Sequence, residues 1–434
     1  MSFLTRRRFL TGTATAAGSL AVASAMGGHA FAQDRRIRHF WWGNPERDKR
    51  TFAVIEIFNG KNPGIVVEGE TLGFNDYFTK LTTQIAGGAM PDVFQNGYGN
   101  MVEYVDKGTT KPLDEAVAVG KIDISKIDPA GISAGTFNGK LYGLTIGANS
   151  MATLINSRLW QEAGIDVDPI TWTYDDLKAA AVKISEKGGP KGTDDLTADW
   201  GAFSVYCGQR GFATQFTEDA KFAFGPEIVI DYWKLWKDIR DAGGTPSAED
   251  TASVAGIADL DKQGVVSGKS AISYAFSNQI VGTQALMQDK LSAGMRPHLK
   301  GGQPGQSIQP SQFICLSRDS RDDDAALAYM NAFVNDLDMT AVLGLERGIP
   351  QQSDVRAALQ ANLTEAEAVT VAYFDAIQPH VAPLAPPPPA GVRELEEAFE
   401  TRAAVSVLLG QASIEDAAAQ YMEEAADILA RANR

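Results

Sequence analysis

Cysteine, histidine and long apolar runs are scarce in this 434-residue chain, and each scarcity excludes a class of protein. Two cysteines, Cys207 and Cys315, cannot make a disulfide framework, and we expect both to be buried thiols. None of the four histidines lies at metal-ligand spacing, so we expect neither a metal site nor a cofactor. A membrane-spanning helix needs about 20 consecutive apolar residues, and the sequence offers no such run.

Positive charge is also in deficit. The chain has 39 Lys and Arg against 54 Asp and Glu, a formal net charge of −15. An acidic chain is repelled by phosphate backbones and anionic lipid surfaces. We therefore expect neither nucleic acid nor a membrane surface as a partner.

The first 32 residues are typical of an export signal. The segment from Thr5 to Leu10 holds three consecutive arginines and looks like a twin-arginine signature, and a weakly apolar stretch follows it. The residues from Ala30 to Ala32 supply the small-x-small pattern that a signal peptidase needs. We expect export to the periplasm, with cleavage between Ala32 and Gln33.

Strands and helices alternate along the first part of the remaining chain. Apolar segments at 37–42, 65–68 and 92–94 predict strands. Asn44 followed by Pro45 predicts a capped helix after the first strand, and Asn75 is expected to cap the helix after the second. Strand–helix–strand order at this density favours a parallel sheet flanked by helices.

The alternation continues to the end of the chain. A capping box at 173–176 predicts the start of a helix. Further strands are predicted at 141–146, 151–155, 270–276 and 313–316, and further helices at 232–239, 324–343, 393–409 and 414–432. A chain of 434 residues is long enough for two lobes, each with its own core.

Four stretches in this order resemble the family 1 extracellular solute-binding proteins, which serve carbohydrate ABC importers. They are a strand entry at 62–67, a helix and strand at 77–93, Gly-Lys-Leu-Tyr-Gly-Leu at 139–144, and a helical segment at 159–177. A shorter match lies at 268–272. Each piece is weak alone, and the ordered set is specific.

The resemblance implies an α/β fold of the two-lobed, type II-like periplasmic-binding-protein kind. Each lobe is expected to hold a mixed, mostly parallel sheet flanked by helices, with a ligand cleft between the lobes. The implied first lobe covers residues 33–143 and 306–348. The implied second lobe covers residues 144–305 and 349–434.

The function that the resemblance implies is capture of a sugar or short oligosaccharide by hinge closure, for delivery to the membrane permease subunits of an ABC importer. A monomer without catalytic activity is expected. A chemosensory sugar-binding protein shares the fold and stays open as an alternative. A hydrolase is the weaker alternative, because Gly131 to Gly135 matches a Gly-x-Ser-x-Gly elbow only as a string.

Candidate ligand-binding residues in the first lobe follow the predicted strands. A sugar presents apolar faces, which suit aromatic rings, and a rim of hydroxyls, which suits amides, acids and arginine. In an open α/β sheet such residues are expected beyond the carboxyl ends of strands. The candidates there are Trp41, Trp42, Asn44, Asn75, Asp76, Gln95 and Asn96. Neighbouring strand residues face opposite sides, so at most one tryptophan is expected to face the cleft.

Candidates elsewhere lie at the expected crossings and in the second lobe. They are Asn149, Ser150, Tyr274, Phe276, Asn278 and Arg347. The basic residues Arg47, Lys49 and Arg50, just beyond the tryptophan pair, raise the hypothesis of an acidic sugar. A solvated helix face is the other interpretation of these three residues.

Overall fold

The structure is a computed structural model that describes residues 35–433. The predicted export signal and its cleavage site lie outside the described residues. Within this range, no helix combines the length and the apolar character needed to cross a bilayer.

Five strands form the larger sheet, in the order β2-β1-β3-β10-β6. β1 pairs in parallel with β2 and β3, as the sequence predicts, whereas β10 runs antiparallel to both β3 and β6. The strands are β1 (Arg35–Trp42), β2 (Ile65–Leu72), β3 (Val93–Asn96), β6 (Leu144–Asn149) and β10 (Gln309–Leu316).

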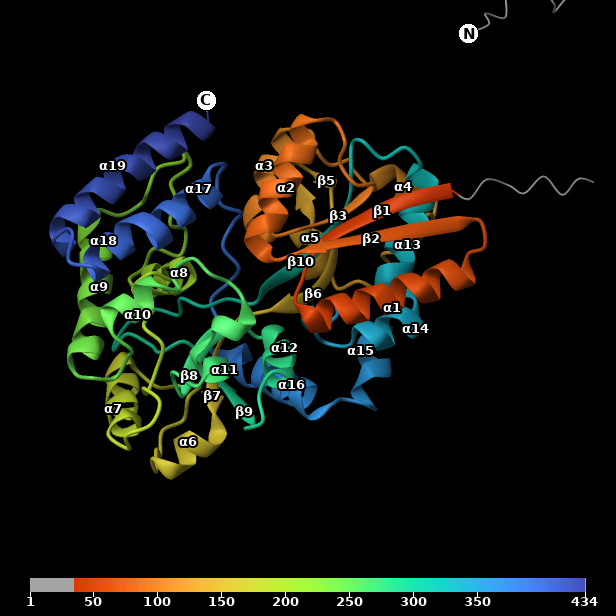
Figure 1. Ribbon diagram of the computed structural model, residues 1–434. Helices are drawn as coiled ribbons and strands as arrows, with labels where there is room; N and C mark the ends of the chain where they lie inside the picture. Colours follow the sequence, from red (N-terminus) through yellow and green to blue (C-terminus); the bar gives the residue numbers. More distant parts are fainter. Residues whose placement is uncertain (1–34, 434) are drawn as a thin grey trace, which may run out of the picture. The chain divides into compact units, whose positions relative to one another are not determined.

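Helices cover both faces of this sheet because the side chains of β1 alternate. Ile37 and Trp41 pack with α1 (Pro45–Lys61) and α13 (Asp323–Asn335) in one core. Phe40 and Trp42 pack on the other face, with α2 (Phe74–Ala86) and α3 (Met101–Asp106). Figure 1 shows α1 and α2 on opposite sides of β1 and β2.

The two predicted helix caps behind β1 and β2 differ in outcome. The side-chain oxygen of Asn44 accepts from the backbone N–H groups of Glu46 and Arg47, which confirms the first cap. The second was wrong, because α2 begins at Phe74, two residues before the predicted start, and has Gly73 at its cap position. The side chain of Asn75 is engaged elsewhere, in contacts with distant segments.

The smaller sheet has three strands in the order β8-β7-β9, and it is antiparallel throughout. They are β7 (Met151–Asn156), β8 (Ile272–Phe276) and β9 (Leu291–Gly294). The prediction of a mostly parallel sheet in the second lobe was therefore wrong. β7 continues directly from β6, and the other two strands flank it in the opposite direction, joined through α12 (Gln279–Ala285).

Two segments near the implied lobe boundaries make contacts within or beside the larger sheet. Residues 144–149 hydrogen-bond within the larger sheet, although the expected boundary assigned them to the second lobe. The segment that holds α15 (Ser353–Gln360) also joins the larger sheet's side, through a bridge between Ile127 and Gln352 and an ion pair between Asp128 and Arg356 (2.7 Å).

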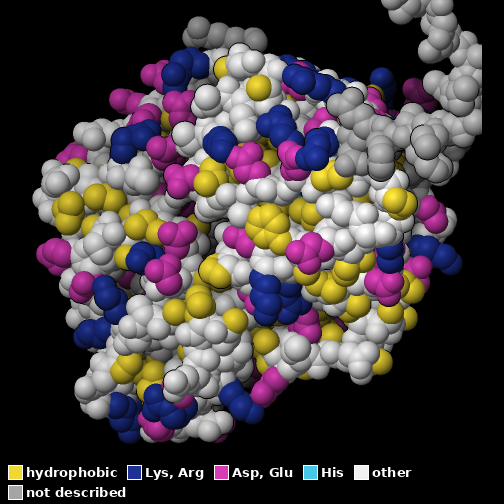
Figure 2. Space-filling view, turned by 45° about the vertical axis from the view of Figure 1, so that its right-hand side comes forward, with side chains coloured by type: hydrophobic (Ala, Val, Ile, Leu, Met, Phe, Trp, Pro, Cys, Tyr) yellow, Lys and Arg dark blue, Asp and Glu magenta, His cyan; other side chains and the backbone are white. Residues whose placement is uncertain are grey.

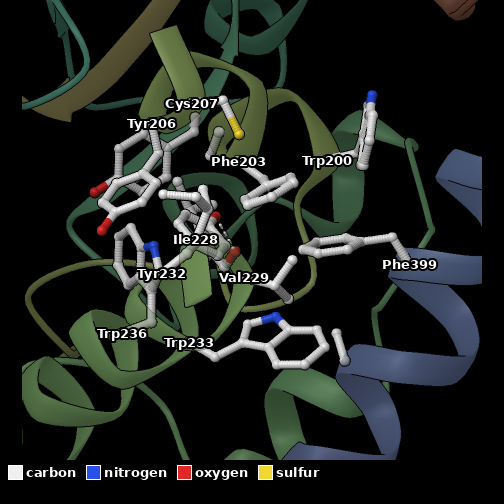
Figure 3. Packing of buried hydrophobic residues seen from close by; sticks show 14 of the residues in the cluster. Trp200, Phe203, Tyr206, Cys207, Ile228, Val229, Tyr232, Trp233, Trp236 and Phe399 are labelled. Carbon is white, nitrogen blue, oxygen red and sulfur yellow. Dashed lines mark hydrogen bonds between the residues drawn. The ribbon is translucent and has the colours of Figure 1, made fainter. Parts of the chain in front are cut away.

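An aromatic core packs against the smaller sheet (Figure 3). It is built from α8 (Trp200–Gln209), α9 (Pro226–Asp241) and α19 (Ile414–Ala432). Phe399 stacks on Phe203 with ring centroids 5.0 Å apart and on Trp233 at 5.5 Å. The C-terminal helices are thus part of this core and not a separate domain.

Two predicted helices are interrupted. The predicted helix at 324–343 divides into α13 and α14 (Leu337–Leu343), because the carboxylate of Asp336 caps a new helix by accepting from Asp338 and Met339. The predicted helix at 393–409 consists of α17 (Val392–Glu397), a π-helix (Ala398–Ala403) and α18 (Ala404–Leu408).

The remaining elements are short connectors and surface helices. Thr173 and Asp176 form the predicted capping box, and both cysteines are buried free thiols, as expected. The elements are α4 (Asp114–Ala118), α5 (Pro129–Ala134), β4 (Thr136–Phe137), β5 (Lys140–Leu141), α6 (Ser157–Glu162), α7 (Tyr174–Ser185), α10 (Ala248–Ala252), α11 (Gly264–Ser267) and α16 (Glu365–Ile377), with 3-10 turns at Tyr98–Asn100, Leu260–Lys262 and Gln378–His380.

Candidate ligand-binding site

Polar side chains gather at one edge of the larger sheet. Because β1, β3 and β6 run in the same direction and β10 runs against them, their carboxyl ends meet the amino end of β10 at that edge. Gln95 and Asn96 end β3, Asn149 ends β6, and Gln312 lies early in β10. This is where ligands bind in open α/β sheets.

A chain of hydrogen bonds joins three predicted site residues across the two sheets. The side-chain amide of Asn149 donates to Asn278 (2.8 Å), which donates in turn to the backbone carbonyl of Glu346 (3.0 Å). The carboxylate of Glu346 accepts from Asn44 (3.2 Å) and from Arg47 (2.8 Å). The end of β6, the start of α12 and the start of α1 are therefore connected through one buried glutamate.

Three buried amide oxygens at the sheet edge accept no hydrogen bond from any described residue. They belong to Gln95, Asn149 and Gln312, which are 1%, 3% and 4% exposed. The amide of Gln95 donates to the carbonyl of Trp42 (3.4 Å), and that of Asn149 donates to Asn278, so their oxygens are left free. Unpaired buried acceptors are costly, and hydroxyl groups of a ligand would satisfy them.

Asn96 differs from its neighbours. Its side-chain oxygen accepts from the N–H of Gly97 (2.9 Å), and its amide lies 3.3 Å from the sulfur of Met101. Both of its polar atoms therefore have partners beside the core that packs under α2 and α3.

The two adjacent tryptophans face opposite sides of β1, as the strand alternation predicts. Trp41 is fully buried on the α1 face, and its indole N–H donates to Asp48 (2.9 Å). Trp42 is 9% exposed, at the carboxyl end of the strand, and packs edge-on against Phe74 at 5.6 Å between centroids. Of the pair, Trp42 is therefore the one that lies toward the polar edge.

The amino end of α2 contacts segments far along the chain. Asn75 donates to the carbonyl of Gly256 (3.0 Å) and accepts from Arg393 (2.8 Å). The guanidinium of Arg393 also lies over the ring of Phe74, 4.9 Å from its centroid. Asp76 is exposed on the first helical turn. Asn75 thus links two segments of the C-terminal half and does not cap its own helix.

Two carboxyl groups lie beside this contact. Burial raises the pKa of Glu396 to about 7, which Arg393 opposes, and raises the pKa of Glu400 to about 8, helped by Asp199 and Glu396. An oxygen of Glu400 accepts from the backbone N–H of Trp200 (3.2 Å). The side chain of Glu396 nevertheless stays 30% exposed, so part of it reaches solvent.

The predicted residues of the smaller sheet have different surroundings. Ser150, in the crossing between the sheets, donates to the carbonyl of Ser307 (2.7 Å). Tyr274 is buried in the aromatic core and hydrogen-bonds to Thr193 (2.7 Å), and burial raises its pKa far above the ordinary value. Phe276 pairs with Met151 at the end of β8 nearest the crossing and is partly exposed.

The structure does not bring Arg347 to the polar edge. Its side chain is 2% exposed, donates to Thr51 (2.8 Å) and lies over the ring of Phe333 on the α13 face. Burial and the neighbouring Arg47 lower its pKa to about 10. Its neighbour Glu346, which the sequence analysis missed, holds the position that connects the sheets.

Two of the basic residues after the tryptophan pair are engaged in ion pairs with acids of the described chain. Arg47 pairs with Glu346, and Arg50 pairs with Glu46 (2.7 Å) and Glu367 (3.3 Å). Lys49 is exposed. The face drawn in Figure 2 likewise has Lys and Arg interspersed with Asp and Glu. These three residues therefore give no support to an acidic ligand.

The chain belongs to the bacterial extracellular solute-binding proteins, whose family model matches residues 53–371. This confirms the resemblance seen in the sequence motifs. A Brucella abortus protein is 28% identical over 234 residues, which cover 52% of this chain and 55% of that one. An arabinooligosaccharide-binding protein of Bacillus subtilis is 26% identical over 204 residues, 46% of each chain. The chain thus spans about half the length of these relatives.

Solved structures confirm the two-lobed α/β fold. A periplasmic oligogalacturonide binding protein from Yersinia enterocolitica, in complex with saturated digalacturonic acid, has a TM-score of 0.81 at 24% identity, covering 92% of this chain and 100% of that one. A second structure of the same Yersinia protein has a TM-score of 0.65 with the same coverage. The fold is therefore that of a periplasmic solute-binding protein.

Proposed function

We propose that this chain is the periplasmic binding component of an ABC importer and captures a short oligosaccharide between two lobes. The first lobe holds the larger sheet, residues 35–149 and 309–360, and the second holds the smaller sheet. The twin-arginine signal delivers the chain to the periplasm. There it acts as a monomer, without catalysis, and passes its ligand to membrane permease subunits.

The hydrogen-bonded chain from Asn149 through Asn278 and Glu346 to Asn44 carries this proposal. It joins the two sheets at the edge where open α/β folds hold ligands. Rotation of one lobe changes how these amides meet. A ligand that bridges the lobes therefore favours the closed arrangement.

The chemistry of the edge supports a hydroxyl-rich ligand. The unpaired oxygens of Gln95, Asn149 and Gln312 are all acceptors, and a saccharide rim supplies donors. Phe276 supplies a partly exposed ring for the apolar face of a sugar, and Trp42, 9% exposed at the end of β1, lies beside the same edge. Relatives named for arabinooligosaccharide and oligogalacturonide binding agree with this ligand class.

The similarity to solved structures supports hinge closure. The chain matches the digalacturonate complex of the Yersinia protein with a TM-score of 0.81, against 0.65 for the second structure of that protein. The digalacturonate complex is therefore the more similar of the two structures over the same share of both chains. The contacts of Asn75 with Gly256 and Arg393 fit a closed form, because they join the two halves beside the site.

A matched pair of asparagine variants tests the proposal. Asn149 and Asn156 are both buried, at the ends of β6 and β7, and the side chain of Asn156 only caps α6 and contacts Asp289. A thermal-shift screen of neutral and acidic oligosaccharides, followed by titration calorimetry, is expected to find one-to-one binding. N149A weakens that binding by about 1–3 kcal/mol, and N156A leaves it unchanged. Equal effects of the two variants, or no binding across the panel, would contradict the proposal.

A further inference from the structure

Arg296 is an almost completely buried cation at the end of the smaller sheet. It follows β9 by two residues and is 4% exposed. Its backbone N–H donates to the side chain of Gln306 (3.1 Å), and its guanidinium lies over the ring of Tyr274, 4.5 Å from the centroid. The side chain is thus fixed in place by one hydrogen bond to its backbone and by one aromatic face.

No carboxylate of the described residues lies within 4 Å of this guanidinium. Its Nε and Nη1 atoms are buried and donate to no described residue. The other two buried arginines in residues 35–433 have an acid in that range, because Arg47 and Arg347 both contact Glu346. Arg296 is therefore the buried arginine whose charge the described chain does not balance.

Such a residue is unfavourable without a partner. A buried ion loses its hydration, and proteins normally compensate with a counter-ion and a full set of hydrogen bonds. The ring of Tyr274 supplies part of the compensation through its π face. The free donors need acceptors that the described chain does not supply.

The position of Arg296 is next to the crossing between the lobes. Gln306, which holds its backbone, also donates to the hydroxyl of Ser150 (2.9 Å) and to the carbonyl of Met151 (2.8 Å). Gly294 pairs with Thr153, so the chain after β9 runs toward Met151 and the ligand edge. The backbone of Arg296 therefore lies in the part of the smaller sheet that is closest to the proposed site, and its guanidinium lies over Tyr274 of the same sheet.

We propose that Arg296 binds a carboxylate of the ligand and that the ligand is an acidic oligosaccharide containing a uronate. This rests on the proposed function and names its substrate class. A guanidinium matches a planar carboxylate by paired hydrogen bonds. The unpaired amide oxygens at the sheet edge accept from the sugar hydroxyls, so the two kinds of group on a uronate meet complementary partners.

Recognition of the sugar carboxylate is therefore assigned to Arg296 and not to the basic residues that follow the tryptophan pair. Arg47 and Arg50 are neutralised by their own acids. Arg393 is shared between Asn75 and Glu396.

A matched pair of ligands tests the proposal on the unaltered protein. Digalacturonate and its dimethyl ester share one skeleton and differ in charge. Titration calorimetry is expected to show that the ester binds about 30-fold or more weakly, the loss typical of removing one partner of a buried ion pair. An ester that binds as tightly as the acid overturns the proposal, while binding of either supports the function proposed above.

Variants test whether Arg296 is the residue that distinguishes the acid from its ester. R296M is expected to weaken digalacturonate binding about 30-fold or more and to change ester binding less than about 3-fold. R296K is expected to bind digalacturonate with an affinity between those of R296M and the unaltered protein. The control is R158M, which removes an exposed arginine paired with Asp289 and Glu162. A loss of the same factor for acid and ester in R296M assigns Arg296 a purely structural role and overturns the proposal. Failure of both ligands and of the whole saccharide panel refutes the proposed function itself.

Discussion

The buried arginines on the two sides of the molecule are treated differently. Beside the larger sheet, Arg47 and Arg347 share the carboxylate of Glu346, which is itself fully buried. Beside the smaller sheet, Arg296 has an aromatic face and no carboxylate within 4 Å among residues 35–433. The first arrangement has its charge balanced within the chain and holds segments together, although Nε and Nη1 of Arg347 donate no hydrogen bond to a described residue. The second is completed by a group from outside, which is the property of a binding residue.

The largest loss of stability is expected where the buried arginines are paired with an acid. Changing Glu346 to Gln leaves two buried arginines without their acid, and breaking a buried ion pair in this way costs about 3–5 kcal/mol. Urea denaturation is the measurement. E68Q is the control, because Glu68 pairs with Arg36 on the surface and its loss is expected to change stability by less than about 1 kcal/mol. Equal effects of the two variants would remove the distinction between the regions.

The next largest effect on stability is expected from two partly buried carboxyl groups. The folded-state pKa values of Glu396, about 7, and Glu400, about 8, lie above the value of about 4.3 for an unfolded chain. The folded protein therefore holds protons that the unfolded chain releases. The stability gained is complete below about pH 4 and is lost as the pH rises to about 8.

Thermal unfolding between about pH 5 and about pH 8.5 measures this loss. The double variant E396Q/E400Q, which cannot titrate at these positions, is expected to show a flatter pH dependence than the unaltered chain. Partial exposure of Glu396 reduces the size of the effect. Parallel curves for the two proteins would show that these carboxyls do not titrate as proposed.

A smaller effect is expected at the contact between the halves. N75A removes the hydrogen bonds to Gly256 and Arg393 from an exposed side chain, so it is expected to lower the free energy of unfolding by about 0.5–1 kcal/mol. In small-angle scattering the unliganded variant is expected to be more open than the unaltered chain. An unchanged scattering curve would mean that this contact does not hold the closed form.

The smallest effect on stability is expected where the charge is unpaired. R296M removes a buried cation that no described acid balances, so the unliganded protein is expected to keep its stability to within about 1 kcal/mol. Chemical denaturation without ligand makes the measurement directly comparable with E346Q. A loss as large as that of E346Q would place Arg296 with the structural arginines.

Local signals in the sequence predicted local structure well. Asn44 with Pro45 and the Thr173 capping box act within a few residues, so their caps could be predicted from neighbours alone. Asn75 has the same chemistry, but its side chain bonds to Gly256 and Arg393, 181 and 318 residues away. Long-range contacts of this kind leave no mark in the local pattern, and so the cap prediction at Asn75 was wrong.

The candidate site shows the same limit. Asn44 was predicted from its place after a strand, Asn149 from the expected crossing and Asn278 from the family resemblance. The structure connects the three through hydrogen bonds. Glu346 and Arg296 were missed, because a glutamate beside Arg347 and an arginine before Pro297 have the appearance of surface residues. Their importance follows from burial and from the presence or absence of a partner charge, which only the packed chain reveals.

Hydrogen–deuterium exchange with the saccharide that calorimetry selects tests the central claim most directly. A ligand held between the lobes is expected to protect the backbone amides at 95–98, which end β3, together with those at 276–279, which end β8 and begin α12. Protection confined to one of these segments, or to neither at saturating ligand, would contradict a site formed by both sheets.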